Sequence, residues 1–186
     1  MKIKVLSAAI LSTSIFLTGC QTMSTQQTAG TIIGGIGGGL LCALSTDNAA
    51  AIAACVAAGA LAGNLIGKHL SEKENESLSN DIQRSLNNNT SSGTASWNSP
   101  ERNNVRANIE YGELVHANDA DLHKRLSSFE GVNLNASDRQ KLSRLDPNTV
   151  CRPTRTSLSV DDRNITDGEI WCRTDSGDYL PLSAIS

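Results

Sequence analysis

Two glycine- and alanine-rich blocks near the N-terminus set the organisation of this 186-residue chain: residues 28–44, TAGTIIGGIGGGLLCAL, and residues 49–67, AAAIAACVAAGALAGNLIG. The four residues between them, Ser-Thr-Asp-Asn at 45–48, are typical of turns and helix N-caps. Between Cys20 and Leu70 the only formal charges are Asp47, in this turn, and Lys68, at the end of the second block. This distribution predicts a helical hairpin over residues 28–70.

Glycine recurs at every fourth position in both blocks. On a helix this spacing leaves a bare groove along one face, which lets two backbones approach closely. Without that close approach each glycine would cost nearly 1 kcal/mol relative to alanine, and a flexible linker would lack the Ile-Ile and Leu-Leu pairs of the first block. The sequence therefore predicts a self-associating zipper. Its candidate helix-packing residues are Gly30, Gly34, Gly38, Gly59, Gly63 and Gly67.

The two blocks are slightly short for membrane spans. As helices of 17 and 19 residues they would measure about 26 and about 28 Å, against a bilayer core of ~30 Å. Alanine and glycine also contribute little insertion energy, so pairing along the glycine faces has to stabilise insertion. We expect a membrane-embedded or membrane-apposed hairpin that forms homo-oligomers, and not two independent spans.

The first 19 residues have the pattern of a secretory signal peptide. Lys2 and Lys4 form the basic region, an apolar stretch follows, and the segment ends in Leu17-Thr18-Gly19 before Cys20. This ending resembles that of bacterial lipoproteins, which implies cleavage before Cys20, acylation of its thiol and of the new amine, and anchoring that is effectively permanent. Gln21 follows in place of aspartate, which by the same resemblance favours the outer membrane. Residues 20–27 would then be a lipidated tether.

Residues 71–186 have the composition of a small soluble unit, so the whole chain is expected to be α+β. A polar helix is predicted from Leu70 to Leu86, a hinge up to residue 93, and a small antiparallel β-rich domain over residues 94–186. Alternation predicts strands at 94–98, 105–115, 151–160, 169–174 and 179–182, with turns at 161–164 and 175–178. Residues 119–148 are predicted to be a helical insertion, with Ser137-Asp138 as an N-cap. All five aromatic residues that follow the signal peptide fall in this half and are expected to form its core.

The five cysteines are assigned individually. Cys20 is the lipid site. Cys151 and Cys172 fall on adjacent predicted strands in an oxidising compartment, so we expect a disulfide between them. Cys42 and Cys55 lie on opposite arms of the zipper, where a bridge and two inert buried thiols both remain open.

The chain resembles the glycine-zipper two-transmembrane family of outer-membrane lipoproteins, which includes the rickettsial-type surface antigen. The matching features are the Leu17–Cys20 ending, the paired GxxxGxxxG blocks and the exit at 67–72. Trp97-Asn98 and the pairs Cys151-Arg152 and Cys172-Arg173 match the family's C-terminal pattern. The segment 119–148 looks like an insertion relative to the family. The resemblance implies an envelope lipoprotein of structural character and transfers no catalytic residue.

Several function classes lack support in the sequence. The net charge of −3 and the absence of a basic stripe argue against nucleic acid as a partner. His69, His116 and His123 are scattered and no Cys-x-x-Cys spacing exists, so neither a metal site nor a cofactor is expected. No Gly-x-Ser-x-Gly motif is present, and Glu110/Glu113 and Asp161/Asp162 fit a solvated face and a turn better than an acid/base pair.

The sequence therefore predicts a non-enzymatic, lipid-anchored outer-membrane protein whose hairpin self-associates and contributes to envelope integrity, in the manner of a surface antigen. The alternative is a lipid-anchored binding module. In that case the C-terminal domain would capture or inhibit another protein, for instance a host lysozyme, and the hairpin would only anchor it. The sequence does not identify a protein partner.

Overall fold

A computed structural model describes residues 56–61 and 64–185 of the chain. The signal peptide, the tether, the first glycine block and the start of the second block lie outside the described residues. Among the described residues no helix is long and apolar enough to cross a membrane. The described part is α+β, with a six-stranded antiparallel sheet and a few short helices.

The sheet has the order β1-β2-β4-β5-β6, and β3 pairs with β4 beside this path. The strands are β1 (Gly93–Asn98), β2 (Arg106–Tyr111), β3 (Val115–His116), β4 (Val150–Val160), β5 (Arg163–Arg173) and β6 (Tyr179–Pro181). The helices are α3 (Glu72–Asn88), α4 (Leu122–Ser127) and α5 (Ala136–Leu142), with 3-10 turns η1 (Gly67–His69) and η2 (Leu182–Ala184). All neighbouring strands run antiparallel.

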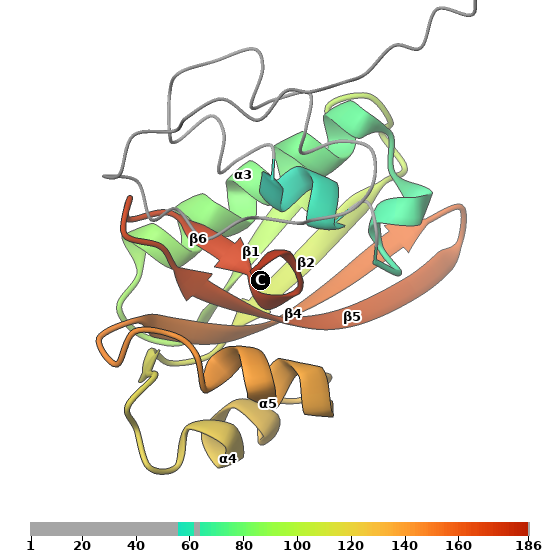
Figure 1. The fold of residues 1–186 in the computed structure, drawn as a ribbon. Helices are drawn as coiled ribbons and strands as arrows, with labels where there is room; N and C mark the ends of the chain where they lie inside the picture. The colour runs from blue at the N-terminus through green and yellow to red at the C-terminus, as the bar shows by residue number, and fades with distance from the viewer. Residues whose placement is uncertain (1–55, 62–63, 186) are drawn as a thin grey trace, which may run out of the picture.

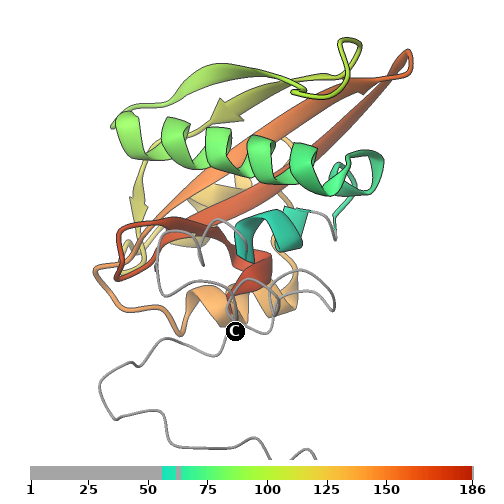
Figure 2. The same cartoon turned by 90° about the horizontal axis from the view of Figure 1, so that it is seen from above.

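Helices lie on both sides of the sheet. Helix α3 and the helical residues 56–61 cover one face, and α4 and α5 lie against the other (Figure 1). Figure 2 shows α3 running along the length of the strands, with residues 56–61 between it and η2. The predicted insertion at 119–148 is thus the segment that forms the second helical layer.

Each face of the sheet has its own core. The larger core joins α3, residues 56–61 and Ile66 to the sheet through both tryptophans, whereas the smaller one lies under α4 and α5. Consecutive residues of β5 alternate between them: Ile170 and Cys172 belong to the smaller core and Trp171 to the larger. Of the five aromatic residues expected in one core, Trp97, Tyr111, Trp171 and Tyr179 lie in the larger core. Phe129 is only partly buried, beside the smaller one.

The predicted polar helix is present as α3, and it begins directly after an N-terminal capping residue. Ser71 is the N-cap of α3, and its side chain and that of Glu74 form a reciprocal capping box. Leu78, Ile82 and Leu86 of the predicted apolar face are buried at 0%, 0% and 1% exposure. Leu70 precedes the helix and caps η1 instead.

Three local predictions are corrected by the structure. The turn between β4 and β5 contains two residues, Asp161 and Asp162, with φ of 48° and 59°, so β5 already begins at Arg163. Positive φ at both positions matches the right-handed twist of the flanking strands. The predicted strand 105–115 divides into β2 and β3. The N-cap of α5 is Asn135, and Asp138 is the third residue of its capping box.

Candidate functional site around the two Cys-Arg pairs

The predicted disulfide is present on the face of the sheet that carries α4 and α5. Cys151 of β4 and Cys172 of β5 are directly paired across the two strands and bonded to each other, 21 residues apart in sequence. Both residues are 0% exposed. The two longest strands are therefore covalently joined at one end of the sheet, inside the smaller core.

Arg152, the neighbour of Cys151, points to the opposite face and is 0% exposed. Its Nε and Nη2 atoms donate to the carbonyl oxygen of Gly112 at 3.0 and 2.8 Å. Its Nη1 donates to Leu86 O at 3.2 Å and Asn89 O at 2.6 Å, and Nη2 also donates to Ser91 O at 2.5 Å. The guanidinium thus links the C-terminal end of α3, the following loop and the end of β2.

The Arg152 charge is stabilised by dipoles and an aromatic ring, because no carboxylate is among these partners. The guanidinium lies over the Tyr111 ring, 4.9 Å from its centroid, and faces the carbonyl end of the α3 dipole. Burial lowers the pKa of the Arg152 guanidinium, yet arginine remains charged in proteins. The segment predicted to be a hinge is where this side chain binds, so α3 and the sheet are held together at that point.

The second Cys-Arg pair is placed differently. Arg173 is exposed, and its Nε donates to Gly177 O at 3.0 Å, within the turn between β5 and β6. The two pairs look alike in sequence, but one arginine is at the centre of the domain and the other closes a surface turn. Strand alternation directs both arginines to the face opposite the disulfide. Only Arg152 lies beside the end of α3, which buries it, whereas Arg173 stands at the end of β5.

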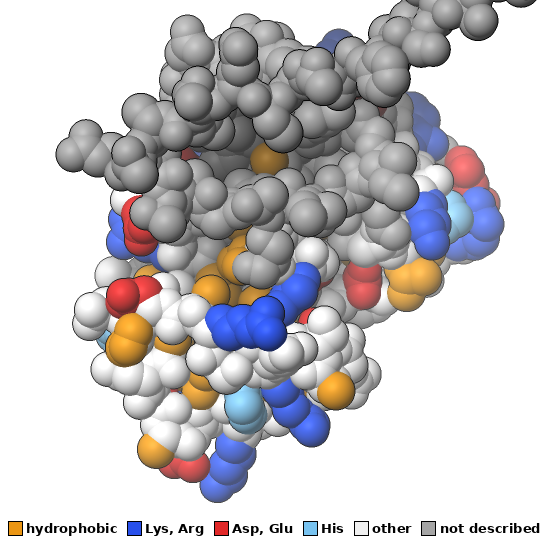
Figure 3. All heavy atoms as spheres, viewed as in Figure 1, with side chains coloured by type: hydrophobic (Ala, Val, Ile, Leu, Met, Phe, Trp, Pro, Cys, Tyr) orange, Lys and Arg blue, Asp and Glu red, His pale blue; other side chains and the backbone are white. Residues whose placement is uncertain are grey.

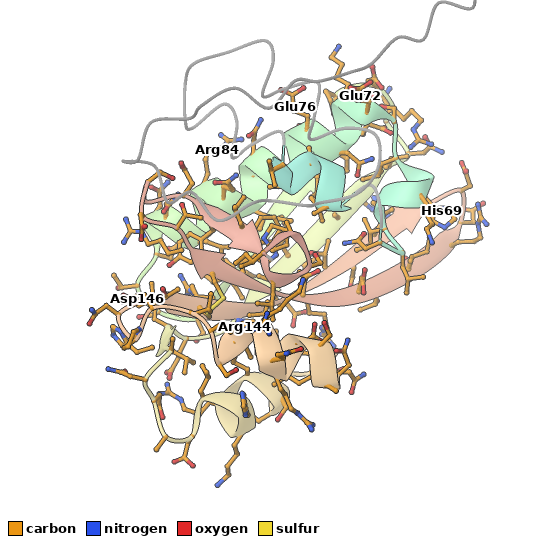
Figure 4. The ribbon with its side chains drawn as sticks, viewed as in Figure 1. His69, Glu72, Glu76, Arg84, Arg144 and Asp146 are labelled. Carbon is orange, nitrogen blue, oxygen red and sulfur yellow. A yellow bond between two sulfur atoms is a disulfide. The ribbon has the colours of Figure 1, made fainter. Side chains whose placement is uncertain are left out.

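A second buried charge joins the start of α3 to the loop after β1. Glu74 is 0% exposed and accepts from Arg102 Nε at 2.9 Å and Nη2 at 2.6 Å, from Ser71 N at 2.9 Å, and from Ser99 Oγ. The Arg102 guanidinium is the main cause that lowers the pKa of the Glu74 carboxyl from 4.5 to about 2. Figure 4 shows the contrasting residues of the same helix, Glu72, Glu76 and Arg84, directed away from the sheet.

The low pKa of Glu74 predicts an acid-sensitive domain. As the pH falls from about 4.5 to about 2, the unfolded chain takes up a proton that the folded domain does not, so the free energy of unfolding decreases. Glu74→Gln should lower it at pH 7 by about 2 kcal/mol, less than the pKa difference alone would give. The reason is that Arg102 is 36% exposed and its charge is screened by water. The variant should also flatten the pH dependence below 4.5.

Urea unfolding followed by the fluorescence of the buried Trp97 and Trp171 measures this effect. Glu76→Gln, on the exposed side of the same helix, is the matched control and should leave both the midpoint and its pH dependence unchanged. Equal behaviour of the two variants would contradict the role assigned to Glu74.

A polar pocket of about 210 Å³ lies between β5, η2 and the start of α5. Glu169 reaches it with a carboxylate that accepts from Ser183 Oγ at 2.9 Å and Ile170 N at 3.1 Å. Burial raises the pKa of this carboxyl. Only glycine fits at position 168, where the backbone at Gly131 packs closely against β5. A Cβ at this position would lie 2.2 Å from Gly131 O.

The other surface features are less specific. An open pocket of about 520 Å³ at the tip of the β4–β5 hairpin is lined by Asn104, Arg106, Ser159, Asp161 and Asp162. Acidic and basic side chains are interspersed over the described part of the face in Figure 3. Within residues 56–61 and 64–185 no group of three His, Cys, Asp or Glu side chains is placed to hold a metal ion.

The predicted site residues fall into three groups. Cys151 and Cys172 are brought together. Gly59 lies in the helical segment 56–61, whereas Gly67 begins η1 after a bend and turn at 64–66 and so does not continue that helix. The remaining residues lie outside the described part of the chain: Cys20, Gly30, Gly34, Gly38, Cys42, Cys55 and Gly63.

Sequence reasoning missed Glu74 and Arg152 as buried charges. The capping-box spacing of Ser71 and Glu74 could have placed the glutamate at the helix start. No local signal marks Arg102, 28 residues away, as its partner.

No family model matches the chain, and comparison with curated proteins and with solved structures finds no similar protein.

Proposed function

We propose that this chain is an outer-membrane lipoprotein with a structural role in the bacterial envelope. Cys20 carries the lipid anchor, the glycine zipper brings copies together, and the disulfide-bonded domain is held at the membrane surface. The observation that carries the proposal is the buried Cys151–Cys172 bond between paired strands. Such bonds form and persist in the oxidising compartments to which a signal such as residues 1–19 directs a chain.

The internal organisation of the domain supports a structural role over a catalytic one. Its buried charges are used to hold elements together: Arg152 joins α3 to β2, and Glu74 joins α3 to the loop after β1. The carboxylate Glu169 lies beside Ser183 and a backbone amide.

Fractionation of a Gram-negative host that expresses the full chain tests the proposal. The wild type should incorporate labelled palmitate, sediment with the outer membrane and give cross-linked oligomers. Cys20→Ser should lose the label and the membrane fraction, because the acyl chains are its anchor. Gly34→Leu with Gly38→Leu should keep the label and lose the oligomers, because the leucines fill the groove. Recovery of unlabelled wild-type protein from the cytoplasm would overturn the proposal.

A binding module is the second candidate function, and the pocket at Glu169 is the observation that favours it. A basic side chain of a protein partner, such as a lysozyme, fits the size and charge of that pocket. The zipper variant separates the two functions. If envelope integrity is lost together with the oligomers, the structural role is supported. If the protein keeps its function in the envelope without oligomers, capture of a partner by the domain is supported instead.

A further inference from the structure

The end of the second glycine block is part of the folded domain. Residues 56–61 are helical, and Val56, Ala57, Leu61 and Ile66 are 6%, 0%, 3% and 1% exposed. They belong to the same core as Leu78 and Ile82 of α3 and the tryptophans of the sheet. Both views place the segment beside α3 on one face of the sheet (Figures 1 and 2). In contrast, Leu65 is 57% exposed.

Polar contacts fix the chain that leads from this segment into α3. Asn75 is 3% exposed, and its Nδ2 donates to Gly67 O at 3.1 Å and Leu70 O at 3.4 Å. The side chain of Asn64 accepts from Gly67 N at 3.2 Å and ends the block in a turn. If the segment left the domain, the apolar side of α3 would be exposed to water, which is unfavourable.

The same residues cannot be seated on the domain and cross a bilayer. With residues 56–61 and 64–67 held by the domain, the second block has residues 49–55 left. Even if fully helical, they would span about 10 Å against a bilayer core of ~30 Å. Its apolar character therefore has an explanation other than lipid contact. The block supplies Val56, Leu61 and Ile66 to a domain with few large apolar residues.

We propose that residues 56–61 and Ile66 dock permanently on α3 and the sheet, so that the second glycine block ends on the domain and does not span the membrane. The zipper available to lipid or to a second copy is then residues 28–55. The inference rests on the proposed lipoprotein function only for the presence of a membrane nearby.

Cysteine accessibility in native membranes tests the docking. The full chain, with Cys42 and Cys55 replaced by alanine, receives a single new cysteine by Leu61→Cys, Leu65→Cys or, as an exposed reference in the loop after α3, Ser92→Cys. Membranes are opened so that both faces meet a membrane-impermeant maleimide. Leu65→Cys should react within about threefold of Ser92→Cys, and Leu61→Cys roughly 100-fold more slowly.

Urea then separates burial in protein from burial in lipid. The protection of Leu61→Cys should disappear at the urea concentration at which tryptophan fluorescence reports unfolding of the domain. A transmembrane block would hide both new cysteines and keep Leu61→Cys protected beyond that concentration. Either result would overturn the proposal.

Charge substitutions provide a second measurement that does not depend on labelling. Leu61→Asp should lower the urea midpoint of the full chain in detergent by about 1 M or more, because an unpaired carboxylate enters the core. Leu65→Asp, four residues away on the exposed side, should leave it unchanged. An unchanged midpoint for Leu61→Asp would contradict docking. The two proposals can fail separately. If Leu61→Asp and Leu65→Asp differ in stability as expected but Cys20 is not labelled by palmitate, the lipoprotein function is overturned and the docking stands.

Discussion

Replacing Arg152 by methionine is expected to lower the free energy of unfolding of the domain by about 4 kcal/mol. Methionine fills part of the volume but donates nothing to the carbonyl oxygens of Gly112, Leu86, Asn89 and Ser91, which the guanidinium now satisfies. Arg152→Lys should recover only a fraction of the loss, because a single ammonium group cannot reach four oxygens arranged around a planar fork.

Equilibrium urea unfolding measures this loss, and hydrogen exchange locates it. Amide protection should fall first in the last turn of α3, where Arg152 binds Leu86 O. Arg173→Met is the control offered by the second Cys-Arg pair. Since Arg173 is exposed, its replacement should change stability by less than about 0.5 kcal/mol. Similar losses for the two arginines would show that Arg152 does not hold α3 to the sheet.

Removing the disulfide is the second large effect. The double substitution Cys151→Ala and Cys172→Ala should lower the free energy of unfolding by roughly 3 kcal/mol, as expected for a closed loop of about twenty residues. Alanine at both positions avoids leaving a lone thiol or burying a hydroxyl group in the smaller core. Urea unfolding of the double variant against the wild type measures the loss, and a loss below about 1 kcal/mol would contradict this role.

Reduction of the wild type provides an independent control. Because Cys151 and Cys172 are 0% exposed, dithiothreitol should reduce their bond at the rate of unfolding and not at the rate of an open disulfide. The reduction rate should therefore rise with urea in parallel with the unfolding rate. Fast reduction in the absence of urea would contradict the buried position.

Much of the local structure of the described domain follows from sequence patterns. The strands predicted at 151–160 and 169–174 place Cys151 and Cys172 on adjacent strands of one hairpin, and the structure confirms their disulfide. The turn of that hairpin is shorter than the predicted 161–164. The apolar stripe of α3 is likewise confirmed. These features depend on neighbours within one element or one hairpin, where spacing alone sets which side chains meet.

Spacing does not reveal contacts between elements that are distant in sequence. Residues 87–93 are predicted to be a hinge because asparagine and serine favour irregular backbone, and no local signal shows that Arg152, more than 60 residues away, binds carbonyl groups there. Ser137-Asp138 is a plausible start for α5 because two cap-forming residues stand there. Asn135 takes that place because its side chain accepts from Asp138 N.

Sequence patterns establish which residues of this protein have to leave water. They mark the strands, the apolar face of α3, the cysteine pair and the glycine blocks, since periodicity and composition are properties of each segment alone. What covers these residues is set by the three-dimensional fold. An alanine- and glycine-rich helix gains similarly by entering lipid or a protein core, so its pattern cannot distinguish the two. Val56, Leu61 and Ile66 are buried in the domain because α3 and the sheet present a complementary apolar face.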